Sequence, residues 1–350
     1  MSKLKNKKFK ASIIGASGYT GSELARILVN HPELEIVNIT SESHQGKRFS
    51  ELHGQFSGIV DLELVRAADV EVSDLDVLFL ALPHGVSMDF VKKWEKSGIK
   101  IIDLSGDFRL ASPEVYEEWY KKKHTYPEGF RNAVYGLPEL HEDSIRKASL
   151  VANPGCYPTA SILSLAPLFN ALDVDPAGAI IDAKSGLTGA GVKASNVTHF
   201  SNVNDNFKAY GIGNHRHTVE IQEQLSFLLK KSVNLQFTPH LLPVDRGILA
   251  TAYMGVEGDM SQQKLDSLYQ DFYQEKPFVR LRNQAPSIKE VRGSNYADVY
   301  PFWDDRTKRA IVITAIDNLV KGAAGQAVHN MNLMLGLEES AGLDQVPMQP

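Results

Sequence analysis

The sequence predicts an α/β protein of two domains, on three observations. Short apolar strand patterns alternate with helical patterns from residue 9 to about residue 153. Beyond residue 156 the apolar segments become longer and fewer helices separate them. The 350 residues also exceed the usual length of one domain. We assign residues 1–153 and 322–350 to a domain with a parallel sheet, and residues 154–321 to an α+β domain with a mixed sheet.

The first domain begins with a strand, helix, strand unit. Phe9 to Ile14 forms an apolar strand pattern, and Leu24, Ile27 and Leu28 follow at helical spacing until Pro32 ends the helix. Further elements are expected as strands at 33–40, 76–82, 100–105 and 149–153 and a helix at 85–98. This alternation is typical of a parallel sheet covered by helices.

The second domain is expected to be richer in strands. Its expected elements are strands within 178–191, 234–244, 246–256 and 309–318 and a helix at 218–231. A final helix at 322–337 places Ala327, Met331 and Met334 on one face, which predicts that it packs back on the first domain.

Composition points to a small-molecule partner in the cytoplasm. A net charge of -5 gives no general attraction to nucleic acid or to an anionic membrane. The basic opening, residues 1–10, precedes only a short apolar run, and no segment approaches the roughly 20 apolar residues of a spanning helix. The single cysteine forms no internal disulfide, as expected in a reducing compartment.

Three glycines follow the first strand at intervals of three: Gly15, Gly18 and Gly21. A glycine turn between a strand and a helix lets the backbone approach a pyrophosphate at the helix N-terminus, so a Rossmann-type dinucleotide-binding domain is predicted. The alternative is a turn that needs glycine for steric reasons alone. The predicted cofactor contacts of this turn are Gly15, Ser17, Gly18, Tyr19, Thr20 and Gly21.

The end of the second strand favours NADP over NAD. An NAD site typically has an acidic residue there, whereas Ser41, Ser43, Lys47 and Arg48 offer hydroxyls and positive charge for a 2′-phosphate. We predict Ser41 and Ser43 as cofactor contacts. Glu42 opposes this interpretation, and an ordinary polar loop is the alternative.

The only cysteine, Cys156, lies between Asn153-Pro154-Gly155 and an apolar helix pattern that contains Ile162 and Leu163. A sulfur at a helix N-terminus is favoured as the thiolate, which a covalent nucleophile requires. The competing interpretation is a buried cysteine that acts as a small hydrophobic residue.

Two histidines, His215 and His217, precede a helix that Thr218 is expected to cap. A helix N-terminus disfavours imidazolium, so a histidine there stays able to accept a proton. His-x-His together with Glu220 and Cys156 is also a conceivable zinc set, but no second cysteine supports it, and we predict no metal.

Two further segments carry candidate site residues. Arg109 follows a strand end, where ligands of such sheets bind, although it could instead pair with Asp107. Ser185 and Gly186 begin the small-residue run "SGLTGAG", which suits an anion nest or close approach of the cofactor, with a flexible glycine loop as the alternative.

Five motifs together, "GASGYTGSEL", "ANPGCYPTA", "SGLTGAG", "HRHTVEI" and "NLVKGAAGQAV", resemble the N-acetyl-gamma-glutamyl-phosphate reductase family, within the semialdehyde dehydrogenase superfamily. The resemblance covers nearly the whole chain. It implies an NADP(H)-dependent enzyme of arginine biosynthesis with a Rossmann-type domain and a catalytic and dimerisation domain, assembled as a homodimer or homotetramer.

The resemblance also implies roles. Cys156 would be the nucleophile and His217 the acid/base; the implied substrate contacts are Arg109, His215 and Ser185, and the implied further cofactor contacts are Gly186 and Asn318. Departures from the family pattern are Glu42 and the pair Val244-Asp245.

The implied reaction is reductive dephosphorylation of N-acetyl-L-glutamyl 5-phosphate to the 5-semialdehyde, through a cysteine thioester and with release of inorganic phosphate. Alternatives are a related reductase that acts on another acyl phosphate, such as carrier-bound aminoadipyl phosphate or aspartyl phosphate, a non-catalytic NADP sensor, and a zinc hydrolase.

Overall fold

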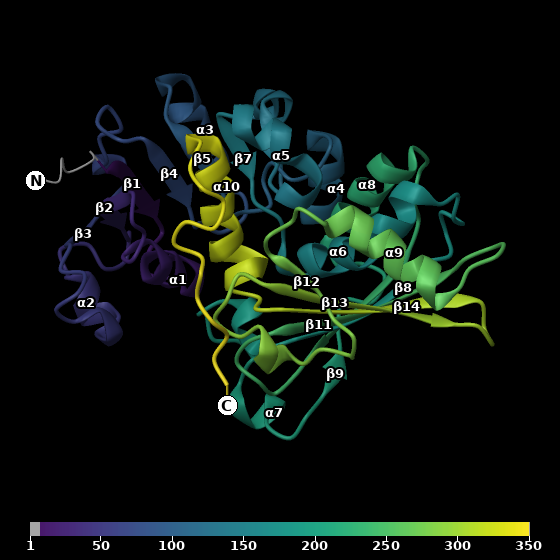
Figure 1. Cartoon of the computed structure of the whole chain (residues 1–350). Coiled ribbons are helices and arrows are strands. Elements are labelled where there is room, and N and C mark those ends of the chain that lie inside the picture. The colour runs from purple at the N-terminus through teal and green to yellow at the C-terminus, as the bar shows by residue number, and fades with distance from the viewer. Residues whose placement is uncertain (1–7, 350) are drawn as a thin grey trace, which may run out of the picture. The chain divides into compact units, whose positions relative to one another are not determined.

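The computed structural model describes residues 8–349, and the chain divides into two compact units (Figure 1). Unit 1 contains the chain up to Glu117, Lys121–Pro154 and Ala323–Asp344. Unit 2 contains Glu118–Tyr120, Gly155–Gly322 and the chain from Gln345 onward. The sequence placed the last residues with the first domain, whereas the backbone N–H of Met348 donates to the carbonyl of Arg292 in unit 2. The basic residues 1–7 lie outside the described part.

Unit 1 is built on a seven-stranded parallel sheet in the order β3-β2-β1-β4-β5-β7-β6. Its strands are β1 (Phe9–Ile14), β2 (Leu34–Thr40), β3 (Leu64–Val65), β4 (Val77–Leu80), β5 (Lys100–Asp103), β6 (Ala133–Tyr135) and β7 (Leu150–Ala152). The strand order reverses at β1, which pairs with β2 on one side and β4 on the other. The carboxyl ends of these central strands are where open sheets of this kind bind ligands.

Helices of unit 1 connect these strands. They are α1 (Tyr19–Leu28), α2 (Phe49–Leu52), α3 (Ser87–Trp94), α4 (Pro113–Tyr120, whose last three residues group with unit 2), α5 (Pro138–Lys147) and α10 (Gly325–Leu335). Ala327, Met331 and Met334 of α10 are buried, and α10 contacts α1, α5 and β5. The final helix therefore completes the parallel-sheet unit, far in sequence from its other helices.

Unit 2 contains a mixed seven-stranded sheet in the order β12-β13-β14-β11-β8-β10-β9. Its strands are β8 (Ile180–Ser185), β9 (Lys208–Ala209), β10 (Gln236–Leu241), β11 (Ile248–Gly255), β12 (Val279–Leu281), β13 (Ala297–Asp304) and β14 (Arg309–Ile316). The antiparallel register aligns Ser185, Ile248 and Ile316, so β8 and β14 end where β11 begins. The loops that carry the expected site motifs meet at this edge of the sheet.

One face of this sheet is covered by α6 (Cys156–Ala171) and α9 (Gln262–Tyr273); α8 (His217–Leu229) packs on α6, and the short α7 is Phe200–Val203. Pro167 lies inside α6 and has no N–H for the carbonyl of Leu163. The hydroxyl of Tyr273 donates to that carbonyl at 2.6 Å. A tyrosine from α9 thus satisfies the acceptor that the proline leaves open.

The two sheets confirm the predicted fold class, although β3, β6, β9, β12 and β13 were not expected from the sequence. Among the described residues, no helix has the length and apolarity needed to cross a bilayer.

Candidate functional site

Cys156 is the first residue of α6, as the sequence predicted. Its N-cap, Gly155, has extended backbone angles and contributes no capping side chain. The cysteine is partly exposed, unlike the buried residue of the competing interpretation. The aligned N–H dipoles of α6 favour negative charge on its sulfur.

Gly322 packs directly against Cys156. A Cβ atom at Gly322 would lie 2.7 Å from the Cβ of Cys156 and 3.1 Å from its Cα. Gly322 belongs to a π-helical turn, Val320–Ala324, that precedes α10, and its N–H donates to the carbonyl of Asp317. The sequence analysis did not identify this glycine, because nothing in its local pattern shows which side chain it approaches.

Glu220 contacts the segment that leads into Cys156. Its side chain is 1% exposed, and Oε1 accepts the backbone N–H of Gly155 at 2.8 Å. This contact ties the first turn of α8 to the first turn of α6. From sequence, Glu220 was considered only as a member of an unlikely zinc set.

His217 and His215 are neighbours in space. Helix α8 begins at His217 with Arg216 as its N-cap, so the expectation that Thr218 caps the helix is wrong. The backbone N–H of His217 donates to Nδ1 of His215, and the two rings are 4.9 Å apart between centroids. The helix therefore begins earlier in the chain than expected.

The protonation state of His215 follows from its surroundings. Burial, and secondarily the charge of Arg216, lowers the pKa of His215 to about 4. Because Nδ1 accepts a hydrogen bond, the neutral ring carries its proton on Nε2. His215 is therefore a neutral hydrogen-bond donor near pH 7.

Two tyrosines complete this cluster. Tyr157 follows Cys156 and donates to the carbonyl of His240 at 2.9 Å, while Tyr210 donates to the Tyr157 hydroxyl at 3.3 Å. Burial raises the pKa of Tyr157 well above its usual range and that of Tyr210 to about 12. Both stay neutral hydroxyls, and the rings of both pack edge-on against His215.

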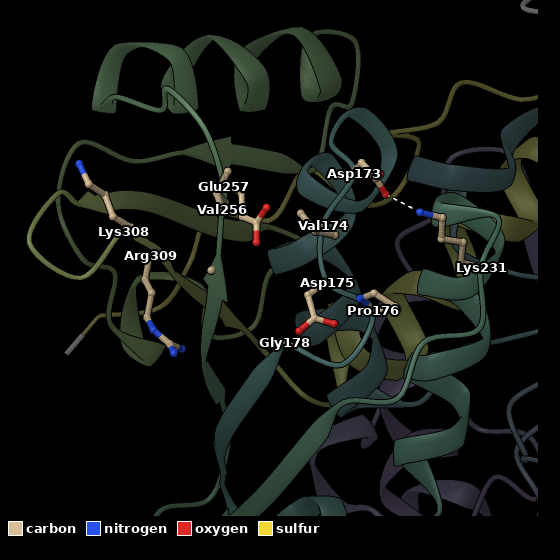
Figure 2. Close-up of a pocket in the computed structure, with 11 residues that line it drawn as sticks. Asp173, Val174, Asp175, Pro176, Gly178, Lys231, Val256, Glu257, Lys308 and Arg309 are labelled. Atoms are coloured by element: carbon tan, nitrogen blue, oxygen red, sulfur yellow. Dashed lines mark hydrogen bonds and ion pairs between the residues drawn. The ribbon is translucent and has the colours of Figure 1, made fainter.

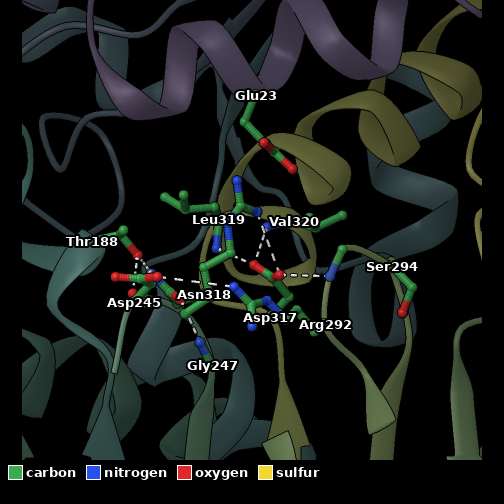
Figure 3. Close-up of polar contacts among 12 residues, drawn as sticks. Glu23, Thr188, Asp245, Gly247, Arg292, Ser294, Asp317, Asn318, Leu319 and Val320 are labelled. Carbon is green, nitrogen blue, oxygen red and sulfur yellow. Dashed lines mark hydrogen bonds and ion pairs between the residues drawn. The ribbon is translucent and has the colours of Figure 1, made fainter. Parts of the chain in front are cut away.

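The predicted contacts Ser185, Gly186 and Asn318 meet at the sheet edge. Ser185 is 2% exposed and its hydroxyl donates to the carbonyl of Gly186. The carboxamide of Asn318 accepts from the N–H of Gly247 at 2.8 Å and donates to Thr188 at 2.9 Å (Figure 3). Asn318 thus joins two loops of unit 2.

A buried carboxylate, Asp317, organises the same edge (Figure 3). Its Oδ1 accepts from the N–H groups of Leu319 and Val320, and its Oδ2 accepts from the N–H of Gly293 at 2.7 Å. Arg246 lies 3.4 Å from Oδ2. The sequence analysis missed Asp317, which fixes the turn that leads to Gly322.

The glycine turn of unit 1 has the geometry of a phosphate-binding turn. Gly15 has a φ of +91°, and a Cβ there would lie 2.5 Å from the carbonyl oxygen of Ala81. A Cβ at Gly21 would lie 2.5 Å from the carbonyl oxygen of Gly15, whereas nothing lies within 4 Å of a Cβ at Gly18. Gly18 is the N-cap of α1 without a capping side chain. Ser17, Tyr19 and Thr20 flank it, and Tyr19 is 41% exposed.

Glu42, the acidic residue that opposed the interpretation of an NADP site, has partners within the protein. One carboxylate oxygen accepts the N–H of Ala67 at 3.0 Å, and the other lies 3.5 Å from Arg66. Ser41 and Ser43 lie close to each other, with 3.5 Å between their hydroxyls. Glu42 therefore caps a short turn after β3, so its carboxylate has a structural role there.

Arg109 is buried and bridges two strand ends of unit 1. Its Nε donates to the carbonyl of Asn153 at 2.7 Å and its Nη2 to the carbonyl of Leu104 at 2.8 Å. Asp107, its alternative partner, accepts from the N–H of Gly85 and the hydroxyl of Tyr116. Arg109 fixes the backbone three residues before Cys156.

A polar pocket of about 510 Å³ opens at the other end of the unit 2 sheet (Figure 2). Gly178, Gly255 and Arg309 of its lining flank the ends of β8, β11 and β14 that are opposite to Ser185. The pocket is therefore separate from the candidate site. The described residues include no group of three or more histidine, cysteine or acidic side chains placed to hold a metal.

Comparison with known proteins defines the class. Residues 10–148 match the semialdehyde dehydrogenase NAD binding domain, and residues 156–318 match the semialdehyde dehydrogenase dimerisation domain. Aspartate semialdehyde dehydrogenase II of Vibrio cholerae has the same fold, with a TM-score of 0.70 at 15% identity over 95% of this chain and 99% of that chain. The fold and these matches define a two-domain semialdehyde dehydrogenase.

The chain belongs to the N-acetyl-gamma-glutamyl-phosphate reductase family, as its motifs predicted. Proteins of that name from Methanococcus maripaludis and Campylobacter jejuni are 48% and 49% identical to it. The first match covers 97% of this chain and 99% of the relative, and the second covers 96% and 98%. The predicted class of enzyme, an oxidoreductase with a nicotinamide dinucleotide-binding domain, is confirmed.

Proposed function

We propose that this protein catalyses the NADPH-dependent reductive dephosphorylation of N-acetyl-L-glutamyl 5-phosphate to N-acetyl-L-glutamate 5-semialdehyde, in arginine biosynthesis. The observation that carries the proposal is a partly exposed Cys156 at the start of α6, between two residues that contact the start of α8. Gly155 before it donates to Glu220, and Tyr157 after it packs against the rings of His215 and His217.

The first step is acyl transfer to sulfur. The Cys156 thiolate attacks the carbonyl carbon of the acyl phosphate, a C–S bond forms, and the bond from that carbon to the phosphate oxygen breaks. Inorganic phosphate leaves with the bonding electrons, and a thioester remains. N–H groups in the first turn of α6 stabilise the oxygen that becomes negative during this attack.

Protons are handled by the histidine segment. We assign His217 as the acid that protonates the oxyanion formed when the thioester is reduced. Neutral His217 takes that proton back as the thiohemiacetal collapses, which releases the aldehyde and the thiolate. His215 stays neutral and donates a hydrogen bond from Nε2 to the substrate. Ser185 and Arg109 are the remaining proposed substrate contacts.

The cofactor binds in the glycine turn of unit 1. Open space at Gly18 and the free N-terminal N–H groups of α1 suit a pyrophosphate, and Ser41 and Ser43 suit a 2′-phosphate. When bound, NADPH supplies the hydride that reduces the thioester carbon. The other proposed contacts are Gly15, Ser17, Tyr19, Thr20, Gly21, Gly186 and Asn318.

The family model for residues 156–318 is that of a dimerisation domain, which supports assembly as a homodimer or homotetramer. We also propose a cytoplasmic location for the enzyme.

The test is reduction of NADP+ by the purified protein with N-acetylglutamate 5-semialdehyde and phosphate. Parallel reactions use aspartate semialdehyde and a Cys156→Ala variant. We expect turnover only with the acetylated aldehyde and the unmodified protein. If the unmodified protein binds NADP+ but does not oxidise that aldehyde, the substrate assignment is refuted.

A further inference from the structure

The loop that follows β2 starts directly beside the glycine turn of unit 1. The carbonyl of Thr40, the last residue of β2, accepts the N–H of Ala16 at 2.9 Å, and the Thr40 hydroxyl accepts the N–H of Gly15 at 3.1 Å. Open sheets of this kind bind the ribose of a dinucleotide near the end of the second strand. The side chains of residues 41–44 therefore lie in the part of the fold that recognises a ribose and its substituents.

Three polar atoms of this loop form a small triangle. Nδ1 of His44 lies 2.9 Å from Oγ of Ser43 and 3.3 Å from Oγ of Ser41, and the two hydroxyl oxygens are 3.5 Å apart. Ser41 is 3% exposed and His44 is half-buried. Hydrogen-bond donors that share one phosphate oxygen are themselves about 3–5 Å apart, so this spacing suits a single anionic group.

The backbone fixes the position of His44. The N–H of Lys47 donates to the carbonyl of His44 at 3.2 Å, which closes a four-residue turn. Gly46, the third residue of this turn, has a φ of +81°, a conformation that favours glycine. The N–H of Gly46 donates to the carbonyl of Leu64 in β3 at 2.9 Å. The turn that carries His44 is thus anchored to the sheet.

Protonation reverses the role of the His44 ring in this triangle. When the neutral ring carries its proton on Nε2, Nδ1 is an acceptor and the serine hydroxyls donate to it. In the imidazolium, Nδ1 is itself a donor, and the hydroxyl protons are released for another acceptor. All three groups can then donate to one anion, and one of the three hydrogen bonds is charge-assisted.

The fixed charges around this loop balance one another. The charged or titratable groups on the loop, on residues 61–66 and at the end of α2 are, besides His44, Glu42, Lys47, Arg48, Asp61, Glu63, Arg66 and His53. Glu42 lies 3.5 Å from Arg66, and Arg48 lies 3.2 Å from Asp61. Lys47 and Glu63 are both exposed and have opposite signs. The charge of His44 therefore decides whether the loop as a whole is neutral or positive.

His53, the second histidine of this region, does not take the same role. Burial lowers the pKa of His53, and the neighbouring His44 acts in the same direction, so His53 is neutral near pH 7. Its Nε2 is also buried. Of the two histidines, only His44 has a ring nitrogen within hydrogen-bond distance of the loop serines among the described contacts.

From these observations we propose that His44 is a specificity-determining residue for the cofactor: its imidazolium and the hydroxyls of Ser41 and Ser43 together bind the 2′-phosphate and so favour NADP(H) over NAD(H). The proposal rests on the cofactor site stated under the proposed function and adds a titratable residue to it. NAD(H) has a hydroxyl in place of the phosphate and gains little from a positive charge. Discrimination between the two cofactors should therefore weaken as pH rises and His44 loses its proton.

The test is titration of the purified full chain with NADP+ and with NAD+, without substrate, at about pH 6.5 and about pH 8.5. The quantity compared is the ratio of the Kd for NAD+ to the Kd for NADP+. A phosphate monoester has a second pKa of about 6, so the 2′-phosphate is mainly a dianion at both pH values. We expect the wild-type ratio to fall at least about fivefold between the lower and the higher pH, because a charge-assisted hydrogen bond is lost.

Two variants of His44 separate its charge from its shape. His44→Gln removes the charge and keeps a polar side chain, whereas His44→Arg keeps a positive charge at both pH values. The matched control is Gln45→Ala, because Gln45 is an exposed neighbour on the same turn. We expect His44→Gln to have the low ratio at both pH values and His44→Arg to keep a high one, while the control follows the wild type.

Two results would overturn the proposal: a wild-type ratio that is equal at both pH values, or a folded His44→Gln variant that keeps the pH dependence of the wild type. The first result needs no variant, so it decides the matter even if His44→Gln does not fold. Because both dissociation constants are measured without substrate, they do not depend on the proposed reaction. A protein with the expected ratios that does not oxidise the aldehyde contradicts the reaction and leaves the role of His44 standing.

Discussion

Gly322→Ala provides a sharp test of how Cys156, the proposed nucleophile, is positioned. Ordinary van der Waals contacts of a Cβ begin at about 3.4 Å, whereas the new atom would lie 2.7 Å from the Cβ of Cys156. The overlap of at least 0.7 Å (3.4 minus 2.7) must be relieved by movement of Cys156 or of the π-helical turn. A displacement of this order at a reacting atom costs about 100-fold in rate.

The assay is kcat/KM for oxidation of N-acetylglutamate 5-semialdehyde, together with the melting temperature and the rate of alkylation of Cys156 by iodoacetamide. The matched control is Gly255→Ala in the same unit, where a Cβ meets nothing within 4 Å. We expect a loss of about 100-fold for Gly322→Ala, an altered alkylation rate, and less than a threefold change for the control. A Gly322→Ala enzyme within threefold of wild type would refute the reasoning that this glycine positions the thiol.

Three further predictions concern stability and cofactor choice. Tyr273→Phe should lower the free energy of unfolding by about 1–2 kcal/mol in urea titrations, because the carbonyl of Leu163 loses its donor, and by less in a Pro167→Ala background. The folded-state pKa of His215, about 4, lies below its ordinary 6.5, so the unfolded state binds the extra proton between these values and stability falls as pH drops from about 6.5 to 4. In the wild type this fall in the free energy of unfolding should total about 2–3 kcal/mol, and His215→Asn should remove most of it. If the pH dependence of the variant equals that of the wild type, other groups cause it. Glu42→Ala should change the ratio of NADP+ to NAD+ affinity by less than about threefold in fluorescence titrations, because its carboxylate caps a turn; a larger shift would place Glu42 at the cofactor.

The structural features that depend on hydrophobic periodicity and on turn residues were predicted correctly from the sequence. The alternation of strand and helix patterns indicated both sheets, and the Pro-Gly turn before an apolar run placed Cys156 at a helix start. These features are local, because a helix N-terminus is specified by the few residues around it.

Contacts between distant segments were not predictable from one sequence. Glu220 on the Gly155 N–H, Asp317 on the N–H of Gly293, and Gly322 against Cys156 each join segments that lie far apart along the chain. Even the start of α8 was misjudged by one residue, because Arg216 adopts helical backbone angles and makes Thr218 part of the first turn.

The position of Cys156 also determines how oxidants affect the enzyme. A partly exposed thiolate is the form of cysteine that peroxide converts to a sulfenic acid. This chain holds no second cysteine that could trap that product as an internal disulfide. Reduction of a sulfenic acid at Cys156 therefore requires a thiol from outside this chain, and further oxidation would remove the nucleophile of the proposed reaction.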